Sequence, residues 1–309
     1  MPRFLLSVVI PVYNEENNID PLLDRLLPVI KSYSYEVLFI NDGSTDLTEE
    51  RIRKHCKQNE DIKLISFNRN FGHQNALTAG YAHAQGDAVV SIDADLQDPP
   101  EVISQMIEQW QKGAKIVYAK RAKRENDTLF KRFSAHLFYH SMNLLSDTAI
   151  PFDVGDYRLL DRVVVRFLND LPEQTRFLRG LVAWSGYPSV YVEFDRTPRH
   201  SGKTHYPFTK MIRFAFYGIT SFTTKPLRIA SYAGFATAAI GFMGIIYAVV
   251  GKLFFQAYWV TGWTALFVGI MFLGGVQLIT IGIVGEYIDR IYTEIQKRPM
   301  FVIKNKVNI

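Results

Sequence analysis

The stretch VVSIDADLQDPPE, residues 89–101, joins a short apolar run to two carboxylates and a proline pair. Its first four residues are mostly β-branched, which predicts a buried strand. Asp93 and Asp95 follow at the carboxyl end of that strand, where open α/β sheets bind their ligands. Mg²⁺ and Mn²⁺ prefer oxygen ligands and often share them with substrate phosphates. The pair therefore favours a divalent-metal site, and the alternative is a solvated acidic turn.

Strand-like and helix-like patterns alternate on both sides of this stretch. Strands are predicted at residues 6–11, 36–40, 62–67, 88–92 and 115–120, and helices at residues 17–31, 48–56, 74–84 and 100–112. Repeated units of this kind predict an α/β domain with a mostly parallel sheet and helices on both faces.

The composition narrows the classes of protein. The net charge of +5 over 309 residues is too modest to indicate a nucleic-acid-binding protein. Cys56 is the only cysteine, so the chain forms no internal disulfide, which agrees with a reducing compartment. The apolar stretch 4–12 is short and lacks a small-residue cleavage site, so we interpret it as a first strand and not as a signal peptide.

Two uncharged apolar runs, residues 229–250 and 263–284, are each long enough to cross a bilayer. Basic residues precede the first run and follow the second, which predicts that both flanks are cytoplasmic. The stretches 129–145 and 206–222 mix basic and aromatic residues, as in interfacial helices or in core helices with a polar face. We expect a catalytic domain (1–205), an interfacial segment (206–228), a two-helix transmembrane hairpin (229–284) and a cytoplasmic tail (285–309).

Polar clusters follow four of the predicted strands, at residues 11–15, 41–44, 68–72 and 93–95. Each cluster alone is explained by turns and helix caps, but four at one sheet edge suggest a common ligand. Neither a dinucleotide-binding G-x-G-x-x-G after a strand nor a P-loop occurs in the sequence. The remaining hypothesis is a nucleotide held by carboxylates, with its diphosphate on a metal ion.

The motifs PVYNE (11–15), NDGSTD (41–46) and DAD (93–95), in this order, resemble inverting GT-A glycosyltransferases of family 2. The strings NFGHQNA (70–76), GDAVV (86–90) and DADLQDPPE (93–101) resemble the polyprenyl-phosphate group, which includes dolichol-phosphate mannose synthases and bactoprenol glucosyltransferases. DVGDYRLLDR (153–162) and the paired apolar runs fit the bactoprenol branch best.

The resemblance implies a role for individual residues. Asp42, with Tyr13 and Glu15 near it, would hold the uracil and ribose of a UDP-sugar, and Asp156 would be the candidate base near the acceptor. Asp95 would be the direct ligand of Mg²⁺ or Mn²⁺, assisted by Asp93. The full set of implied donor-binding residues is Pro11, Tyr13, Glu15, Asp42, Asn70 and Asp93.

The predicted acceptor, a lipid phosphate, is largely ionised at neutral pH because its second pKa is near 6. It needs cations that align one oxygen more than it needs a base. The candidate cations are Arg121, Arg132, Arg199 and Lys203, although each could also be a solvated surface charge. The last two lie in RHSGKTHY (199–206), which resembles the family's basic loop R-x-x-G-x-S-K-Y with threonine for serine and histidine for lysine. Asp156 could therefore orient these cations and not act as a base.

These observations predict a multi-pass enzyme of the bacterial inner membrane with a cytoplasmic catalytic domain. It would transfer a hexose, with glucose as the first candidate, from a UDP-sugar to undecaprenyl phosphate with inversion. One alternative is a processive polysaccharide synthase, although QTRFL (174–178) is not that class's Q-x-x-R-W. Another is a non-catalytic, membrane-anchored nucleotide-sugar-binding protein. No nucleic-acid partner is expected, and a homo-oligomer is left open.

Overall fold

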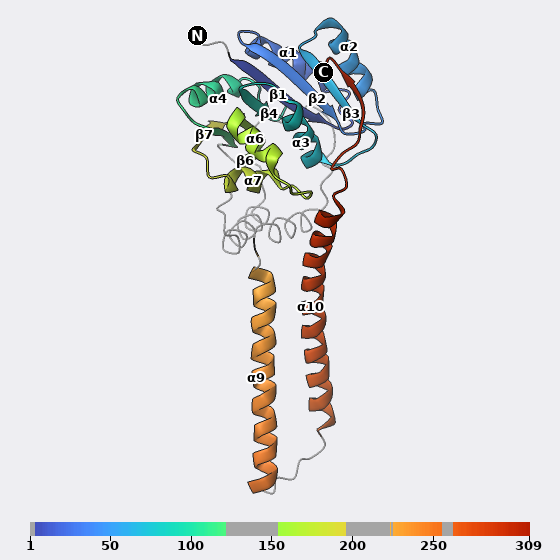
Figure 1. Cartoon of the computed structure of the whole chain (residues 1–309), viewed down its shortest axis with the longest axis vertical. Coiled ribbons are helices and arrows are strands. Elements are labelled where there is room, and N and C mark those ends of the chain that lie inside the picture. Colours follow the sequence, from blue (N-terminus) through green and yellow to red (C-terminus); the bar gives the residue numbers. More distant parts are fainter. Residues whose placement is uncertain (1–3, 122–153, 196–222, 224, 255–261) are drawn as a thin grey trace.

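The computed structural model describes residues 4–121, 154–195, 223, 225–254 and 262–309. An α/β domain lies at one end, and two long helices project from it (Figure 1). The elements, in chain order, are β1 (Leu5–Val12), α1 (Ile19–Ile30), β2 (Ser34–Asn41), α2 (Thr48–Gln58), β3 (Ile62–Phe67), α3 (His73–His83), β4 (Ala88–Ser91), α4 (Val102–Gln111), β5 (Ile116–Arg121), β6 (Val154–Asp161), α6 (Arg162–Asp170), α7 (Leu178–Trp184), β7 (Ser189–Phe194), α9 (Lys225–Phe254), α10 (Trp263–Gln296) and β8 (Ile303–Val307).

The sheet has the strand order β7-β5-β6-β4-β1-β2-β3-β8. Strands β1 to β4 are parallel, as the repeated βα units predict. Strand β6 lies antiparallel between β4 and β5, and β8 is antiparallel to β3. The sheet is therefore mixed but mostly parallel: β5 and β7 run in the same direction as β1 to β4, and only β6 and β8 run against them.

Helices cover both faces of this sheet. Helices α1, α2 and α4 pack on one face, where Val8 and Ile10 of β1 contribute to the core. Helices α3, α6 and α7 pack on the other face, toward which Val9 points. Gly80 allows α3 to approach β1 closely, since a Cβ built there would lie 2.1 Å from Val9 Cγ1. This approach places the first turn of α3 beside the carboxyl ends of the central strands.

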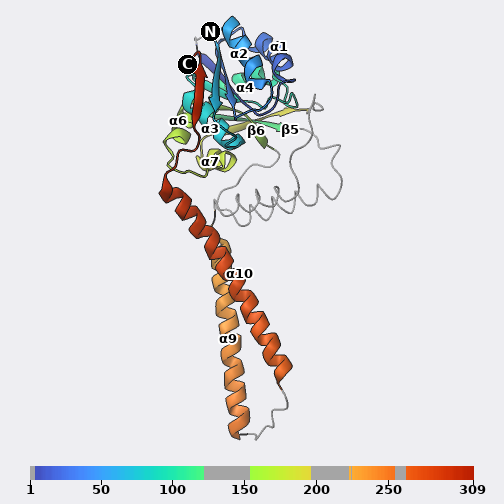
Figure 2. The same cartoon turned by 90° about the vertical axis from the view of Figure 1, so that its right-hand side faces the viewer.

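Helices α9 and α10 run side by side in both views, with the start of α9 and the end of α10 nearest the domain (Figures 1 and 2). In the described part of the chain, one segment, Gly269–Gln296 in α10, has the length and hydropathy of a membrane span. The second span, in α9, is not confirmed and stays a prediction. The predicted interfacial stretches 129–145 and 206–222 lie outside the described residues.

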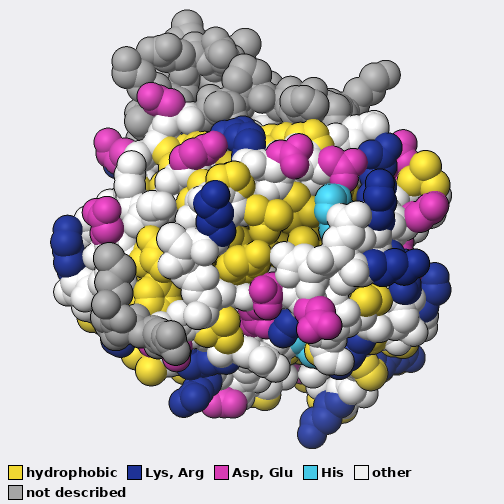
Figure 3. Space-filling view, turned by 90° about the horizontal axis from the view of Figure 1, so that it is seen from above, with side chains coloured by type: hydrophobic (Ala, Val, Ile, Leu, Met, Phe, Trp, Pro, Cys, Tyr) yellow, Lys and Arg dark blue, Asp and Glu magenta, His cyan; other side chains and the backbone are white. Residues whose placement is uncertain are grey.

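The C-terminal stretch 285–309 has more structure than the predicted tail. Its first part continues α10 to Gln296, and Ile303–Val307 returns to the sheet as strand β8. The domain and the end of α10 are thus joined by a strand pairing. Figure 3, which views the end opposite the helices, shows basic and acidic side chains interspersed over that face.

Candidate active site

The turns after β1 and β2 are tied together at the carboxyl edge of the sheet. Asn14 accepts a hydrogen bond from Thr45 N (2.8 Å) through its side-chain oxygen, and its own backbone N–H donates to Ser44 Oγ (3.0 Å). Asp42 N donates to Val12 O at 2.9 Å, which places Asp42 next to the residue before Tyr13. The Tyr13 side chain is 45% exposed, so its ring is available to a planar ligand.

Asp42 is buried and organises the next loop. Its two carboxylate oxygens accept hydrogen bonds from Phe71 N (2.6 Å) and Gly72 N (2.9 Å). Burial raises the pKa of Asp42, and these two backbone donors oppose that shift. Gly43 has φ +70°, and a Cβ there would lie 2.4 Å from Arg69 C, so the turn after β2 presses against the same loop. Asp42 therefore holds the loop that carries Asn70.

The two aspartates after β4 differ in their surroundings. Asp93 has a half-exposed side chain, whereas Asp95 is buried and accepts a hydrogen bond from Gln97 N (3.1 Å). Partial desolvation of its carboxylate raises the pKa of Asp93, and the nearby Asp156 and Asp95 carboxylates add to that effect while His73 opposes it. Leu96 has φ +60°, a left-handed conformation that costs an apolar L-residue about 1 kcal/mol. The loop thus gathers negative charge on a strained backbone.

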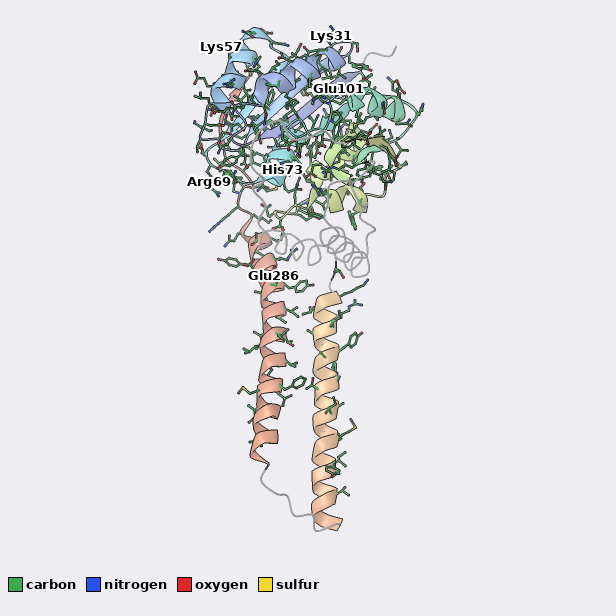
Figure 4. The ribbon with its side chains drawn as sticks, turned by 180° about the vertical axis from the view of Figure 1, so that it is seen from behind. Lys31, Lys57, Arg69, His73, Glu101 and Glu286 are labelled. Carbon is green, nitrogen blue, oxygen red and sulfur yellow. The ribbon has the colours of Figure 1, made fainter. Side chains whose placement is uncertain are left out.

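His73, the first residue of α3, lies between two of these carboxylates. Its Nε2 is 3.7 Å from Asp93 Oδ1 and 3.3 Å from Asp156 Oδ2. Burial alone would lower the pKa of His73, but the two carboxylates outweigh it and raise the pKa to about 8. This shift favours the imidazolium form of His73 at neutral pH. Figure 4 shows His73 and Arg69 on the side of the domain nearest α10, with Lys31 and Lys57 toward the other end.

Asp156, in strand β6, is surrounded by donors. Arg158 Nη2 lies 2.7 Å from Asp156 Oδ1, and Arg179 Nη2 lies 3.0 Å from Oδ2. Gln74 Nε2 donates to the same Oδ2 at 3.4 Å. Burial alone would raise the pKa of Asp156, but Arg179, His73 and Arg158 hold it well below its usual range. The carboxylate is a fixed counter-ion and a weak base.

The predicted acceptor cations are only partly described. Arg121 ends β5 near Gly155 of β6, since a Cβ built on Gly155 would lie 3.7 Å from Arg121 Nη2. The other candidates, Arg132, Arg199 and Lys203, lie outside the described residues. Pro11 lies in β1, and Glu15 is held by a hydrogen bond from its N–H to Thr48 Oγ1 (2.9 Å).

The Asp93–Asp95 pair fits a cation that arrives with a substrate better than a resident metal centre. Among the described residues, no group of three or more His, Cys, Asp or Glu side chains could hold a metal ion. Mg²⁺ is commonly bound by one or two carboxylates together with substrate phosphates. The Asp156 and Asp95 carboxylates also raise the pKa of Asp93, so a positive charge placed near Asp93 would stabilise this loop.

Four residues that contact Asp156 were given no role in the sequence analysis: His73, Gln74, Arg158 and Arg179. The first two occur in NFGHQNA, and Arg158 occurs in DVGDYRLLDR, so the motif strings already contained them. Arg179 follows QTRFL and is the only charge in FLRGLVAW (177–184), a run that is otherwise apolar apart from its glycine. A lone charge in a short apolar helix was the signal available for it.

Comparison with known proteins defines the class of this fold and site. Residues 7–168 match the family model "Glycosyl transferase family 2", and the chain belongs to that family. A crystal structure of M. tuberculosis glucosyl-3-phosphoglycerate synthase is similar with a TM-score of 0.50 and 19% identity, covering 71% of this chain and 80% of that one. This second likeness shows the fold alone.

Relatives of similar length lie closer in sequence. The chain is 44% identical to the bactoprenol glucosyl transferase of Shigella phage SfV, over 97% of this chain and 98% of that protein. It is 45% identical to the uncharacterized glycosyltransferase YkcC of Bacillus subtilis, over 98% of this chain and 94% of that protein. The predicted family 2 glycosyltransferase is thereby confirmed.

Proposed function

We propose that this protein transfers glucose, with inversion, from UDP-glucose to a polyprenyl phosphate at the cytoplasmic face of the bacterial inner membrane. The observation that carries the proposal is the cluster in which His73 lies between Asp93, on the donor side, and Asp156. His73 of this cluster lies on the side of the domain nearest the long helices, where a lipid-borne acceptor would arrive (Figure 4). The name of the SfV relative supports both the sugar and the lipid.

The donor binds across the carboxyl ends of β1, β2 and β4. Tyr13 stacks on the uracil, and Asp42 and Glu15 hold the nucleoside end, while Asn70 lines the loop that Asp42 fixes. Asp93 and Asp95 would hold Mg²⁺ or Mn²⁺, which supplies Lewis-acid stabilisation of the leaving diphosphate when bound.

Asp156 orients cations and accepts no proton in this proposal. The acceptor phosphate is already ionised near neutral pH, so its oxygen can attack the anomeric carbon directly as UDP departs. Arg179 and His73, both paired with Asp156, direct positive charge toward that oxygen. Arg121, Arg132, Arg199 and Lys203 complete the acceptor site in this proposal.

Both long helices cross the membrane as an antiparallel hairpin in this proposal. Tyr287 in α10 donates to Thr223 O (2.9 Å), just before α9 begins, so the two cytoplasmic ends are joined. Exposed apolar side chains along both helices, such as Phe235 and Leu278, support contact with lipid.

A donor screen tests the function. The purified full-length protein in lipid nanodiscs receives Mn²⁺, undecaprenyl phosphate and one of UDP-glucose, UDP-galactose or UDP-N-acetylglucosamine. We expect a glucosylated lipid from UDP-glucose, and its loss in excess EDTA. Binding of UDP-glucose without any glycolipid would instead indicate a non-catalytic binding protein, and a polymeric product would indicate a processive synthase.

A further inference from the structure

The cytoplasmic end of α10 is hydrogen-bonded to the segment that leads into α7. Glu294, two residues before the end of α10, accepts hydrogen bonds from Gln174 N (3.0 and 2.9 Å to its two oxygens) and Thr175 N (3.2 Å). Hydrogen bonds to a charged acceptor are roughly twice as strong as neutral ones. Glu294 therefore ties this segment to a helix predicted to cross the membrane.

The same segment continues directly to the candidate active site. Arg179, the second residue of α7, donates to Asp156 through Nε (3.2 Å) and Nη2 (3.0 Å). Leu178 N donates to Gln74 Oε1 (3.0 Å), and the Gln74 amide also reaches Asp156. A displacement of the start of α7 would therefore move the guanidinium that pairs with Asp156.

We propose that Glu294 is a positioning residue for the transferase site. By fixing the start of α7 to the end of α10, it sets the position of Arg179 on Asp156 and so couples the seating of α10 to acceptor alignment. This inference rests on the proposed function.

The surrounding contacts separate positioning from simple folding. Arg176 anchors the same segment to the end of α6, donating to Leu168 O (3.0 Å) and Leu171 O (2.6 Å). Strand β8 independently attaches the chain beyond α10 to β3. Glu294 also interacts electrostatically with Arg176, but loss of its carboxylate leaves the hydrogen bonds of Arg176 and the β8 pairing in place while it removes the hydrogen bonds between α10 and the segment before α7.

The test compares Glu294→Ala with Asp289→Ala, an exposed acidic residue of the same helix, in full-length protein in nanodiscs. We expect Glu294→Ala to lower kcat/KM for lipid phosphate by about tenfold to a hundredfold, as expected for a small misplacement. UDP affinity with Mn²⁺, measured by calorimetry, should stay within about twofold, because Glu294 touches none of the donor loops. Asp289→Ala should match the wild type in both. A lowered melting temperature with unchanged kcat/KM would overturn the proposal.

A double-mutant cycle with Arg179→Ala identifies the route of the effect. If Glu294 acts through Arg179, Glu294→Ala should reduce kcat/KM by less than about twofold in the Arg179→Ala background. If the wild type is active and the losses of the two single variants multiply in the double variant, the positioning role is refuted but the proposed function stands. A wild type that makes no glycolipid would refute the proposed function. If the alanine variant does not fold, Glu294→Gln enters the same cycle, since it keeps one accepting oxygen.

Discussion

Replacing Asp156 with asparagine separates a base from an orienting group. Arg158 is fully buried, and its Nε and Nη1 have no hydrogen-bond partner within the described part of the chain, so Asp156 is its counter-ion. Removing one partner of a buried ion pair costs about 3–5 kcal/mol. The amide still accepts one hydrogen bond, so we expect a loss near the lower end, about 3 kcal/mol. A domain with about 5–15 kcal/mol of stability would still fold after this change, but its melting temperature would be lower.

The effect on catalysis follows from the direction of the pKa shift. The pKa of Asp156 is depressed well below its usual range by Arg179, His73 and Arg158, which outweigh burial, so the wild-type carboxylate stays ionised from about pH 5.5 to 8.5. The Asp156→Asn variant should lose about a hundredfold in kcat/KM for lipid phosphate, because Arg179 is no longer held in line. This loss should not shrink as the pH rises; it should grow toward pH 8, because the variant lacks one of the two carboxylates that raise the pKa of His73 to about 8.

The assay measures glucolipid formation at saturating UDP-glucose with varied lipid phosphate. Asp24→Asn, an exposed aspartate of α1, serves as the matched control and should behave as the wild type. Recovery of Asp156→Asn activity as pH rises through the phosphate pKa near 6, with unchanged KM, would refute the orienting role and identify a base.

Three further changes test the metal site, the fold and the topology. Asp95→Asn removes a charged oxygen ligand and should abolish glucolipid formation with little change in melting temperature; near-normal turnover would refute the metal assignment. Asp161→Ala removes an α6 N-cap and should lower stability by about 1–2 kcal/mol at pH 7. The pKa of Asp161 is lowered in the folded protein, because the Val163 N–H and other donors outweigh burial. The difference in thermal stability between the variant and the wild type should therefore shrink as the pH falls below about 4. An equal difference at pH 3 would contradict this prediction. Gly262→Cys should react with an impermeant maleimide added outside the cell. The buried Cys56, whose pKa is raised to about 11, should not react. Labelling of the variant only from inside the cell would exclude the transmembrane hairpin.

The first half of the fold was predictable because its strands follow ordinary patterns. Val8, Ile10 and the other residues of β1 are apolar and buried, and α1 has helical spacing of its leucines. The predicted bounds of the first five strands agree with the structure to within two residues at each end. The match of residues 7–168 to a family 2 model also confirms the resemblance read from the motifs.

Strand β6 was not predicted, because its sequence carries charges into the core. Asp156 and Arg158 are both buried within it and neutralise each other, a tertiary effect that a local pattern does not report. The same holds for Arg179, whose ion pair with Asp156 joins α7 to β6. Each side chain looks unfavourable alone, and only their pairing explains them.

Strand β8 was also not predicted from the sequence, but for a different reason. Its residues, IKNKV, have three polar side chains in a row between two apolar ends, and they follow a long apolar helix, so they look like a solvated basic tail. Pairing with β3 is a contact between distant parts of the chain, set by where α10 ends. Phe301, just before β8, stacks on Phe67 with ring centroids 5.0 Å apart, which fixes that return.

The anomeric configuration of the lipid product tests the central claim most directly. UDP-glucose carries an α-linked glucose, and direct attack by the acceptor phosphate inverts that centre. Proton NMR of the product from wild-type protein, UDP-glucose and undecaprenyl phosphate should show a β-glucosyl phosphate, with one UDP released per glucolipid. An α-linked product, or UDP release with glucose transferred only to water, would contradict the account.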